Sequence, residues 1–169
     1  MNHDNFIFKK GARAILLDEQ GRVLLGKRAK GIESGKWCLI GGKPEEGETT
    51  KAAVIREVKE EISIDFEPIF YRNFKGIDKN KKVKWTSAYF IGHINSHQLQ
   101  GNLNLAELAE VRFFSKEELA NLEIAFDHKK VLEKFFSDFI STKDISTQNK
   151  MDTEKLIKQR KDPDLKSTA

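Results

Sequence analysis

The chain has 169 residues, 38% of them hydrophobic and 33% charged, which is typical of one soluble globular domain. Its formal net charge is +4, from 30 basic and 26 acidic residues, an excess too small to indicate a nucleic-acid-binding protein. The single cysteine, Cys38, excludes an internal disulfide framework and fits a reducing compartment. Because Cys38 stands in an apolar run, we expect a buried, inert thiol.

The N-terminal segment lacks the pattern of a targeting signal. Its apolar stretches are short and are interrupted by Lys9, Lys10 and Arg13, whereas a signal peptide has a continuous apolar segment. No run in the chain approaches the roughly 20 apolar residues of a membrane-spanning helix. We therefore expect a cytoplasmic protein without a membrane partner.

Several short apolar runs predict strands. Residues 12–17 and 22–28 flank the turn sequence DEQG and are expected to form a hairpin. Residues 67–75 and 82–94 alternate in the manner of strands, with a turn over 76–81. Residues 110–114 predict one more strand.

Three segments predict helices. Residues 49–62 form the first, and Ser115 caps a short second helix with Glu118 at the capping-box position. Residues 126–140 are amphipathic, with an apolar stripe of Val131, Leu132, Phe135, Phe136 and Phe139.

The composition changes after Ile140. Residues 141–169 contain no aromatic residue and hold 7 basic and 5 acidic residues. We expect a mostly disordered tail with a transient helix over 152–161, so that residues 1–140 form the domain.

The stretch GGKPEEGETTKAAVIREVKEEISI, residues 41–64, carries the strongest functional signal. Two glycines allow a sharp turn and a close approach to a ligand. Thr49 is expected to cap the helix that follows. Its apolar stripe is predicted as Ala52, Ile55, Val58 and Ile62, with Glu57, Glu60 and Glu61 gathered on roughly the opposite side.

Three neighbouring carboxylates repel one another unless a cation relieves them. Oxygen ligands of this kind suit magnesium, or manganese in its place. Arg56 is placed to reach Glu60 one turn on, or Glu48 in the preceding loop, and so to orient a carboxylate without acting as a ligand.

The spacing resembles the signature of the Nudix (MutT-like) hydrolases. Gly42, Glu48, Arg56-Glu57 and Glu60-Glu61 stand at the family's intervals, and Ser63 stands where the family usually has glycine. The resemblance implies an α/β/α sandwich with a mixed central sheet, in which residues 41–64 form a loop-helix-loop. It also implies hydrolysis of a nucleoside diphosphate linked to a further moiety, with water as the nucleophile.

The resemblance assigns roles to individual residues. Glu57, Glu60, Glu61 and the Gly41 carbonyl are the expected metal ligands, and Arg56 and Glu60 belong to the catalytic face. The proton acceptor is either Glu57 or an acid in a later loop, Glu107 or Glu110. Expected substrate contacts are Arg28, Gly42, Lys43 and Asp127, although Asp127 equally suits a helix N-cap. Trp85, Tyr89 and Phe74 are candidates for stacking on a base, but strand aromatics more often belong to the core.

The substrate remains open at this stage, and we favour a small nucleotide such as a nucleoside triphosphate or ADP-ribose. One alternative is hydrolysis at an RNA 5′ end, which the pI near 9.0 favours. The charges of residues 1–140 nearly balance, with 23 basic and 21 acidic residues, and this argues against that alternative. The other alternative is a nucleotide sensor without chemistry, although all the acids of the signature are present. A homodimer is also left open.

Overall fold

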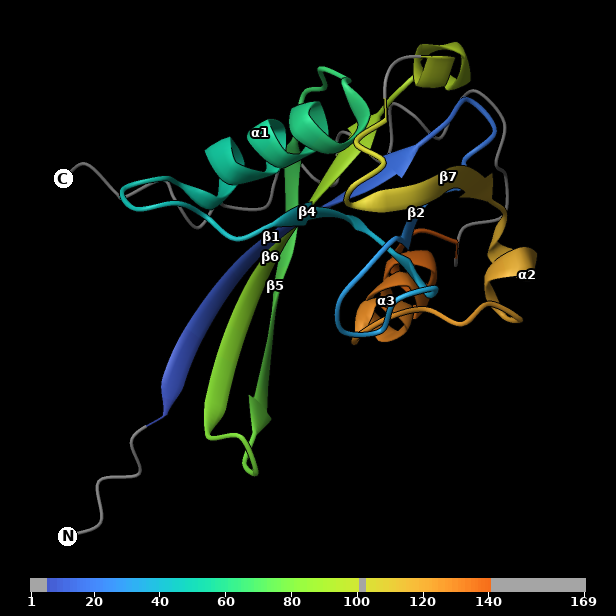
Figure 1. Cartoon of the computed structure of the whole chain (residues 1–169). Coiled ribbons are helices and arrows are strands. Elements are labelled where there is room, and N and C mark those ends of the chain that lie inside the picture. The colour runs from blue at the N-terminus through green and yellow to red at the C-terminus, as the bar shows by residue number, and fades with distance from the viewer. Residues whose placement is uncertain (1–5, 101–102, 141–169) are drawn as a thin grey trace, which may run out of the picture.

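Three long strands form the spine of the structure, a computed structural model that describes residues 6–100 and 103–140 (Figure 1). Strand β1 (Ile7–Leu17) runs parallel to β6 (Val83–His93), from the pair Ile7 and Val83 to the pair Leu17 and His93. Strand β5 (Ile69–Asp78) pairs with β6 in the antiparallel sense, with a bulge between Phe70 and Arg72. One parallel pair of strands among antiparallel pairs makes the sheet mixed, as the family resemblance implied.

Four shorter strands complete the sheet of the described residues. They are β2 (Val23–Arg28), β3 (Trp37–Cys38), β4 (Ile40–Gly42) and β7 (Leu108–Phe114). The strand order is β3-β2-β1-β6-β5, with β4 added to β1 and β7 added to β2. Short β4 sets Gly42 beside Ala12 and Gly41 beside Arg13.

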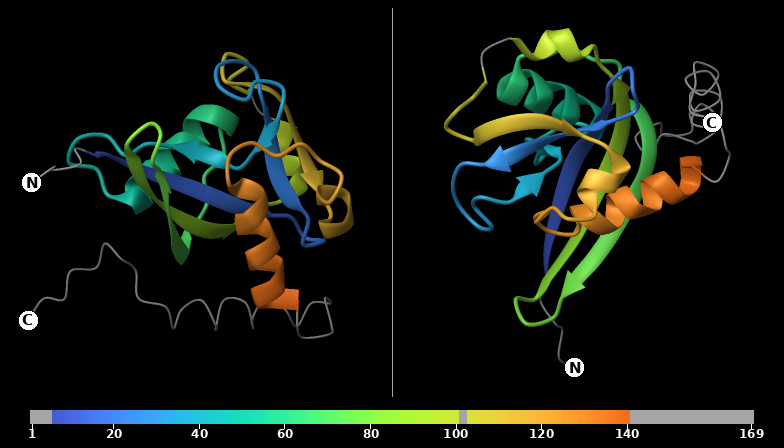
Figure 2. Two further views of the ribbon diagram at one scale, coloured as in Figure 1. Left: turned by 90° about the horizontal axis from the view of Figure 1, so that it is seen from below. Right: turned by 90° about the vertical axis from the view of Figure 1, so that its right-hand side faces the viewer.

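Helices cover both faces of the sheet, which confirms the predicted sandwich (Figures 1 and 2). Helix α1 (Thr50–Ile62) lies on one face, while α2 (Lys116–Leu119) and α3 (His128–Ile140) lie on the other. A 3₁₀ turn, η1, spans Ser96–Gln100. None of the described helices is long and apolar enough to cross a membrane.

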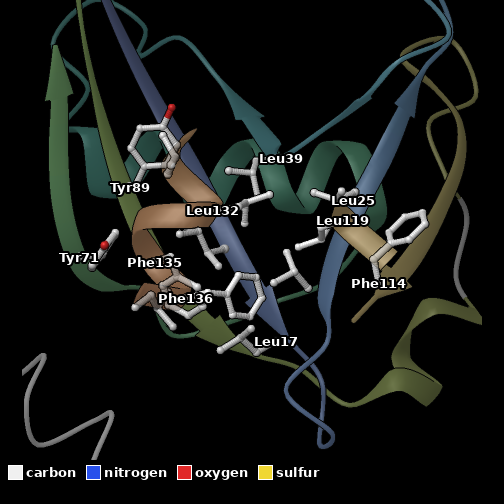
Figure 3. Packing of buried hydrophobic residues seen from close by; sticks show 14 of the residues in the cluster. Leu17, Leu25, Leu39, Tyr71, Tyr89, Phe114, Leu119, Leu132, Phe135 and Phe136 are labelled. Atoms are coloured by element: carbon white, nitrogen blue, oxygen red, sulfur yellow. The ribbon is translucent and has the colours of Figure 1, made fainter. Parts of the chain in front are cut away.

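The alternation of β1 explains why two cores form. Ala14 and Leu16 face α1 and pack with Val54 and Val58, because successive side chains of a strand point to opposite faces. Ile15 and Leu17 face the other way, toward α3. Figure 3 shows the second core, in which side chains of α3 and the strands meet; it includes Leu17, Leu39, Tyr71, Leu132, Phe135 and Phe136.

Local signals in the sequence were accurate where a few neighbouring residues decide the structure. Thr49 caps α1 by accepting from the Ala52 N–H at 3.1 Å. Ser115 and Glu118 form the predicted capping box of α2. Ser63 ends α1 in the left-handed region with φ 59°, which is the conformation that glycine adopts more readily.

Strand limits differed from the predictions because pairing is not local. The turn after β1 exists, since the buried Asp18 carboxylate accepts from the Gln20 and Arg22 N–H groups. The expected hairpin is nearly absent, however: β1 and β2 pair only at Leu17 and Val23, and β2 pairs along its length with β7. Strand β5 extends into the turn that was predicted over 76–81, so the turn between β5 and β6 comprises residues 79–82.

The predicted apolar stripe of α1 was wrong at two positions. Ala52 and Ile55 are exposed, and the buried residues are Ala53, Val54, Val58 and Ile62. The face is therefore rotated from the predicted one, which brings Glu57 and Glu61 closer to the sheet. The predicted tail over 141–169, with its helix at 152–161, lies outside the described residues.

Candidate active site

The turn at Gly41 and Gly42 fits closely between β1 and α1. Gly41 has φ +134°, and a β-carbon there would collide with the carbonyl oxygen of Ala12. A β-carbon on Gly42 would overlap the Glu57 carboxylate. Both positions therefore exclude a side chain, and the absence of one lets the Glu57 carboxylate lie directly against the backbone.

Helix α1 directs its acidic side chains in different directions. Val54, Val58 and Ile62 anchor the helix to the sheet. Glu57 and Glu61 lie three and seven residues after Val54, so they flank the buried face, and the Glu57 side chain is only 17% exposed. Glu60 points away from that face and is 55% exposed. The structure thus places Glu57 and Glu61 beside the buried face, while Glu60 lies on the exposed side and shares the Arg56 guanidinium with Glu57.

Arg56 connects the loop before α1 to the acids on the helix. It binds the Glu48 carboxylate with two hydrogen bonds, each of 3.0 Å. Its Nη1 donates to Glu57 at 3.2 Å and to Glu60 at 3.1 Å, and its Nη2 donates to the Lys43 carbonyl. The hydrogen bonds with Glu48, followed by the nearby Glu57 charge, raise the Arg56 pKa. Arg56 therefore makes both predicted contacts, with Glu48 and with Glu60, and in addition orients Glu57.

A small pocket opens beside this helix. Its lining combines acidic, basic and aromatic residues, which are Arg13, Arg28, Cys38, Leu39, Gly41, Glu61, Glu107, Leu108, Phe126 and His128. Burial raises the pKa of Glu61 to about 8, with further contributions from the Glu57 and Glu107 charges. Arg13 and a hydrogen bond from the Gly41 backbone lower that pKa.

The site's chemistry fits a divalent cation. Two carboxylates and a glycine turn supply hard oxygen donors, and the burial that raises the Glu61 pKa leaves its negative charge poorly compensated by the protein alone. No group of three or more His, Cys, Asp or Glu side chains converges on one point within residues 6–100 and 103–140. Magnesium retains several waters and requires few protein ligands, so the residues that would hold it here are Glu57, Glu61 and Gly41 through its carbonyl.

Arg13 is the first functional side chain that sequence reasoning missed. Its Nη1 donates to the Gly42 carbonyl at 2.5 Å and to the Ala12 carbonyl at 2.9 Å, which holds the glycine turn against β1. A signal was present: Arg13 shares the strand face of Ile15 and Leu17, which are buried. A charged residue at an inward-facing position indicates a polar site.

His128 is the second missed residue. The Leu39 N–H donates to its Nδ1 at 3.1 Å, so the neutral ring carries its proton on Nε2. Burial, with the nearby charges of Arg13 and Arg28, lowers the His128 pKa to about 3. His128 is therefore a neutral hydrogen-bond donor in the pocket wall at any physiological pH.

Arg28 and Phe126 form the outer wall of the pocket. The Arg28 guanidinium lies 4.9 Å from the centre of the Phe126 ring, and its Nε donates to the Ile32 carbonyl at 2.9 Å. Phe126 is 47% exposed and adopts φ +57°, a strained value for a bulky residue. The Glu33 carboxylate accepts its backbone N–H and so fixes this conformation.

The remaining predicted residues are distributed unevenly. Glu107 lines the pocket and forms a 3.4 Å ion pair with Lys30. Glu110 is exposed on β7 opposite Lys27 and does not line the pocket. The Asp127 carboxylate pairs with Lys130 at 3.2 Å, and Lys43 is exposed in the loop before α1.

The aromatic candidates for base stacking mostly belong to the core. Tyr89 is 2% exposed and packs edge-on against Phe74 at 5.2 Å. Trp85 covers Gly76, where a β-carbon would strike its ring. Cys38 is a free, buried thiol whose pKa is raised by burial, in agreement with the prediction.

Comparisons with known proteins identify the family. The chain matches the family model described as NUDIX domain over residues 8–135. An ADP-ribose pyrophosphatase of Methanocaldococcus jannaschii is 29% identical over 121 residues, which cover 71% of this chain and 69% of that protein. An oxidized purine nucleoside triphosphate hydrolase of Danio rerio is 40% identical over 55 residues, 32% of this chain and only 35% of that protein.

A solved structure has a similar fold. The structure of a MutT/nudix family protein from Listeria innocua has a TM-score of 0.62 with this one at 28% identity. The superposition covers 79% of this chain and 94% of that one. The family model spans most of the chain, including the glycine turn, α1 and the pocket, and the protein therefore belongs to the Nudix family.

Proposed function

We propose that this protein is a magnesium-dependent nucleotide pyrophosphohydrolase. Water would attack phosphorus in the diphosphate of a small nucleotide and release a nucleoside monophosphate. The observation that carries the proposal is the pairing of Glu57 and Glu61 beside Gly41 and Gly42, at the edge of a pocket with two arginines. The free, buried Cys38 supports a cytoplasmic location as part of the same proposal.

Different residues would bind the cation and the phosphates. Glu57, Glu61 and the Gly41 carbonyl would hold the cation. When bound, a divalent cation supplies Lewis acidity and offsets the negative charge of the diphosphate. Arg56 keeps the Glu57 carboxylate in place through its bond of 3.2 Å, and Glu60 shares the same guanidinium. Arg28 and Lys43 would contact the phosphates, together with the Gly42 backbone beside the Glu57 carboxylate.

Glu107 is the favoured proton acceptor for the attacking water. A general base must be within reach of the water and must not be committed to another strong partner. Glu57 accepts a hydrogen bond from Arg56 and is also an expected metal ligand, so its carboxylate is already committed. Glu107 lies in the pocket near Glu61, and its pair with Lys30 is half exposed and correspondingly weak. Glu110 is too far outside the pocket lining to be the preferred base.

The pocket walls favour a nucleotide with one base. Phe126 offers an exposed ring whose position is fixed by Glu33 and Arg28, and His128 offers an Nε2–H donor next to it. A stacking face beside a donor suits a purine or pyrimidine ring. The names of the relatives, an ADP-ribose pyrophosphatase and an oxidized purine nucleoside triphosphate hydrolase, support the same two substrate classes.

One screen tests the proposal. Canonical and oxidised nucleoside triphosphates, ADP-ribose, nucleotide sugars, dinucleoside polyphosphates and 5′-triphosphorylated RNA are compared by kcat/KM with magnesium, since specificity is a ratio of those values. We expect a clear lead for a nucleoside triphosphate or ADP-ribose. A lead for a dinucleoside polyphosphate or for RNA contradicts the substrate proposal. Tight nucleotide binding without turnover of any compound contradicts the enzymatic proposal and favours a sensor.

A further inference from the structure

The far ends of three strands project beyond both helical layers. Residues 7–10 of β1 and residues 73–86 of β5, β6 and their turn form this projection, here named the basic arm (Figures 1 and 2). No described helix covers it in any of the views. Phe8 is 76% exposed and Ile7 60%, although both belong to a strand whose other half is buried.

The excess positive charge of the domain is concentrated on this arm. It contains seven lysines, which are Lys9, Lys10, Lys75, Lys79, Lys81, Lys82 and Lys84, and one acid, Asp78, which pairs with Lys81 at 3.6 Å. The rest of residues 1–140 holds 16 basic and 20 acidic residues. The near balance seen in the sequence therefore conceals a separation of charge: the arm is strongly positive and the body of the domain is negative.

The pairing register of the three strands places several of the arm's side chains in rows on one face of the sheet. Phe8, Lys84 and Ile77 are neighbours across the three strands, and Lys10, Thr86 and Lys75 form the next row. Paired residues in adjacent strands point to the same side of a sheet. The Lys84 Nζ lies 5.7 Å from the Phe8 ring centre. One face thus presents three lysines together with an exposed aromatic ring.

We propose that this face of the basic arm binds single-stranded nucleic acid. Lysines at strand spacing neutralise successive phosphates of the backbone, and an exposed ring stacks on a base without regard to its identity. A single strand is required because bases within a duplex do not offer their faces to a protein side chain. This binding does not depend on the hydrolysis proposed above.

Two features favour nucleic acid over other partners. A symmetric contact between the arms of two copies would set seven lysines against seven, and a contact between such surfaces is repulsive. The arm also leads to the candidate active site: Lys10 precedes Ala12 by two residues, and Ala12 pairs with Gly42. That separation is about 7 Å along the strand. A bound strand would therefore present its end close to a site that recognises nucleotides.

The test measures binding of a fluorescent single-stranded oligouridylate to the full chain by anisotropy, over a salt series in EDTA. The probe carries a 5′ hydroxyl and so has no diphosphate to hydrolyse. The arm variant is Lys10→Gln, Lys75→Gln and Lys84→Gln together. The matched control, Lys51→Gln, Lys116→Gln and Lys130→Gln, removes the same charge from α1, α2 and α3. Melting temperatures and nucleotide hydrolysis confirm that both variants fold.

We expect the arm variant to bind at least about tenfold more weakly, with the slope of log K against log salt reduced by about 2, since each single-strand phosphate contact contributes about 0.7. The control should retain the wild-type slope. Phe8→Ala, a change at an exposed position, should weaken binding with an unchanged slope, and it serves alone if the arm variant does not fold. The proposal would be overturned if the wild type did not bind the oligonucleotide, or if both triple variants weakened binding equally. It would also be overturned if the protein bound duplex as tightly as single strands, or bound only anionic vesicles.

Discussion

Replacing Glu61 by glutamine should stabilise the metal-free protein while removing its activity. Burial and the charges of Glu57 and Glu107 raise the Glu61 pKa from 4.5 to about 8. Between these two values the folded protein holds a proton that the unfolded chain has released. The free energy of unfolding of the wild type therefore falls as pH rises through this window. Glutamine has nearly the same shape and cannot ionise, so the free energy of unfolding of the variant does not fall with pH for this reason.

The expected size of the effect follows from the shift. One pKa unit corresponds to about 1.36 kcal/mol, so the full shift would amount to about 4.8 kcal/mol at pH 8 and above. The effective dielectric constant near a pocket open to water reduces this value, and we expect about 2–3 kcal/mol. For a chain of this length that corresponds to an increase of roughly 5–10 °C in melting temperature.

The assay is thermal unfolding in EDTA at pH 5, 6.5 and 8.5 for the wild type, Glu61→Gln and Glu60→Gln. The advantage of Glu61→Gln should grow with pH, whereas Glu60→Gln removes an exposed partner of Arg56 and should change stability by less than about 1 kcal/mol. Magnesium should raise the melting temperature of the wild type and leave that of Glu61→Gln nearly unchanged. A Glu61→Gln protein no more stable than the wild type at pH 8.5 would refute the reasoning.

Three further predictions concern the glycine turn, the helix end and pH. Gly42→Ala places a methyl group on the Glu57 carboxylate and should lower kcat/KM at least about tenfold with little change in melting temperature, whereas unchanged kinetics would show that Glu57 is not held there. Ser63→Gly relieves the left-handed φ of 59° and should add about 0.5–1 kcal/mol in urea unfolding, while Ser63→Ala, which keeps the strain, should not. Activity should rise toward alkaline pH, because the raised Glu61 pKa lets protons compete with the cation, and a rate maximum near pH 5 would contradict this order.

Sequence reasoning succeeded where the determining interactions are local. The N-cap at Thr49, the capping box at Ser115 and the left-handed end at Ser63 each depend on contacts within a few residues. The spacing of Glu57 and Glu61 with the glycine turn was likewise visible in a single segment. The rotation of α1 was not, because Ala52 and Ala53 are equally apolar and only packing decides which of them is buried.

Features that depend on pairing between distant segments were missed. β3 and β4 have two and three residues and are too short to show a period. The parallel pairing of β1 with β6 joins residues 76 positions apart, as in Ile7 and Val83. The same pairing assembles Lys10, Lys75 and Lys84 on one face, so a chain that appears nearly balanced in its sequence carries a strongly charged arm. Arg13 and His128 are also far apart in the sequence, and only the folding of the chain brings both into the pocket lining.

The central claim is that Glu57 and Glu61 hold the cation that makes hydrolysis possible. It is tested most directly by measuring kcat/KM for the best substrate of the screen, over a magnesium series, in the wild type and in Glu57→Gln. The account predicts no turnover by the wild type in EDTA, restored turnover on adding magnesium, and a loss of at least about 10²-fold in Glu57→Gln at saturating magnesium. Turnover by the wild type that is unaffected by EDTA, or a Glu57→Gln variant as active as the wild type, would contradict it.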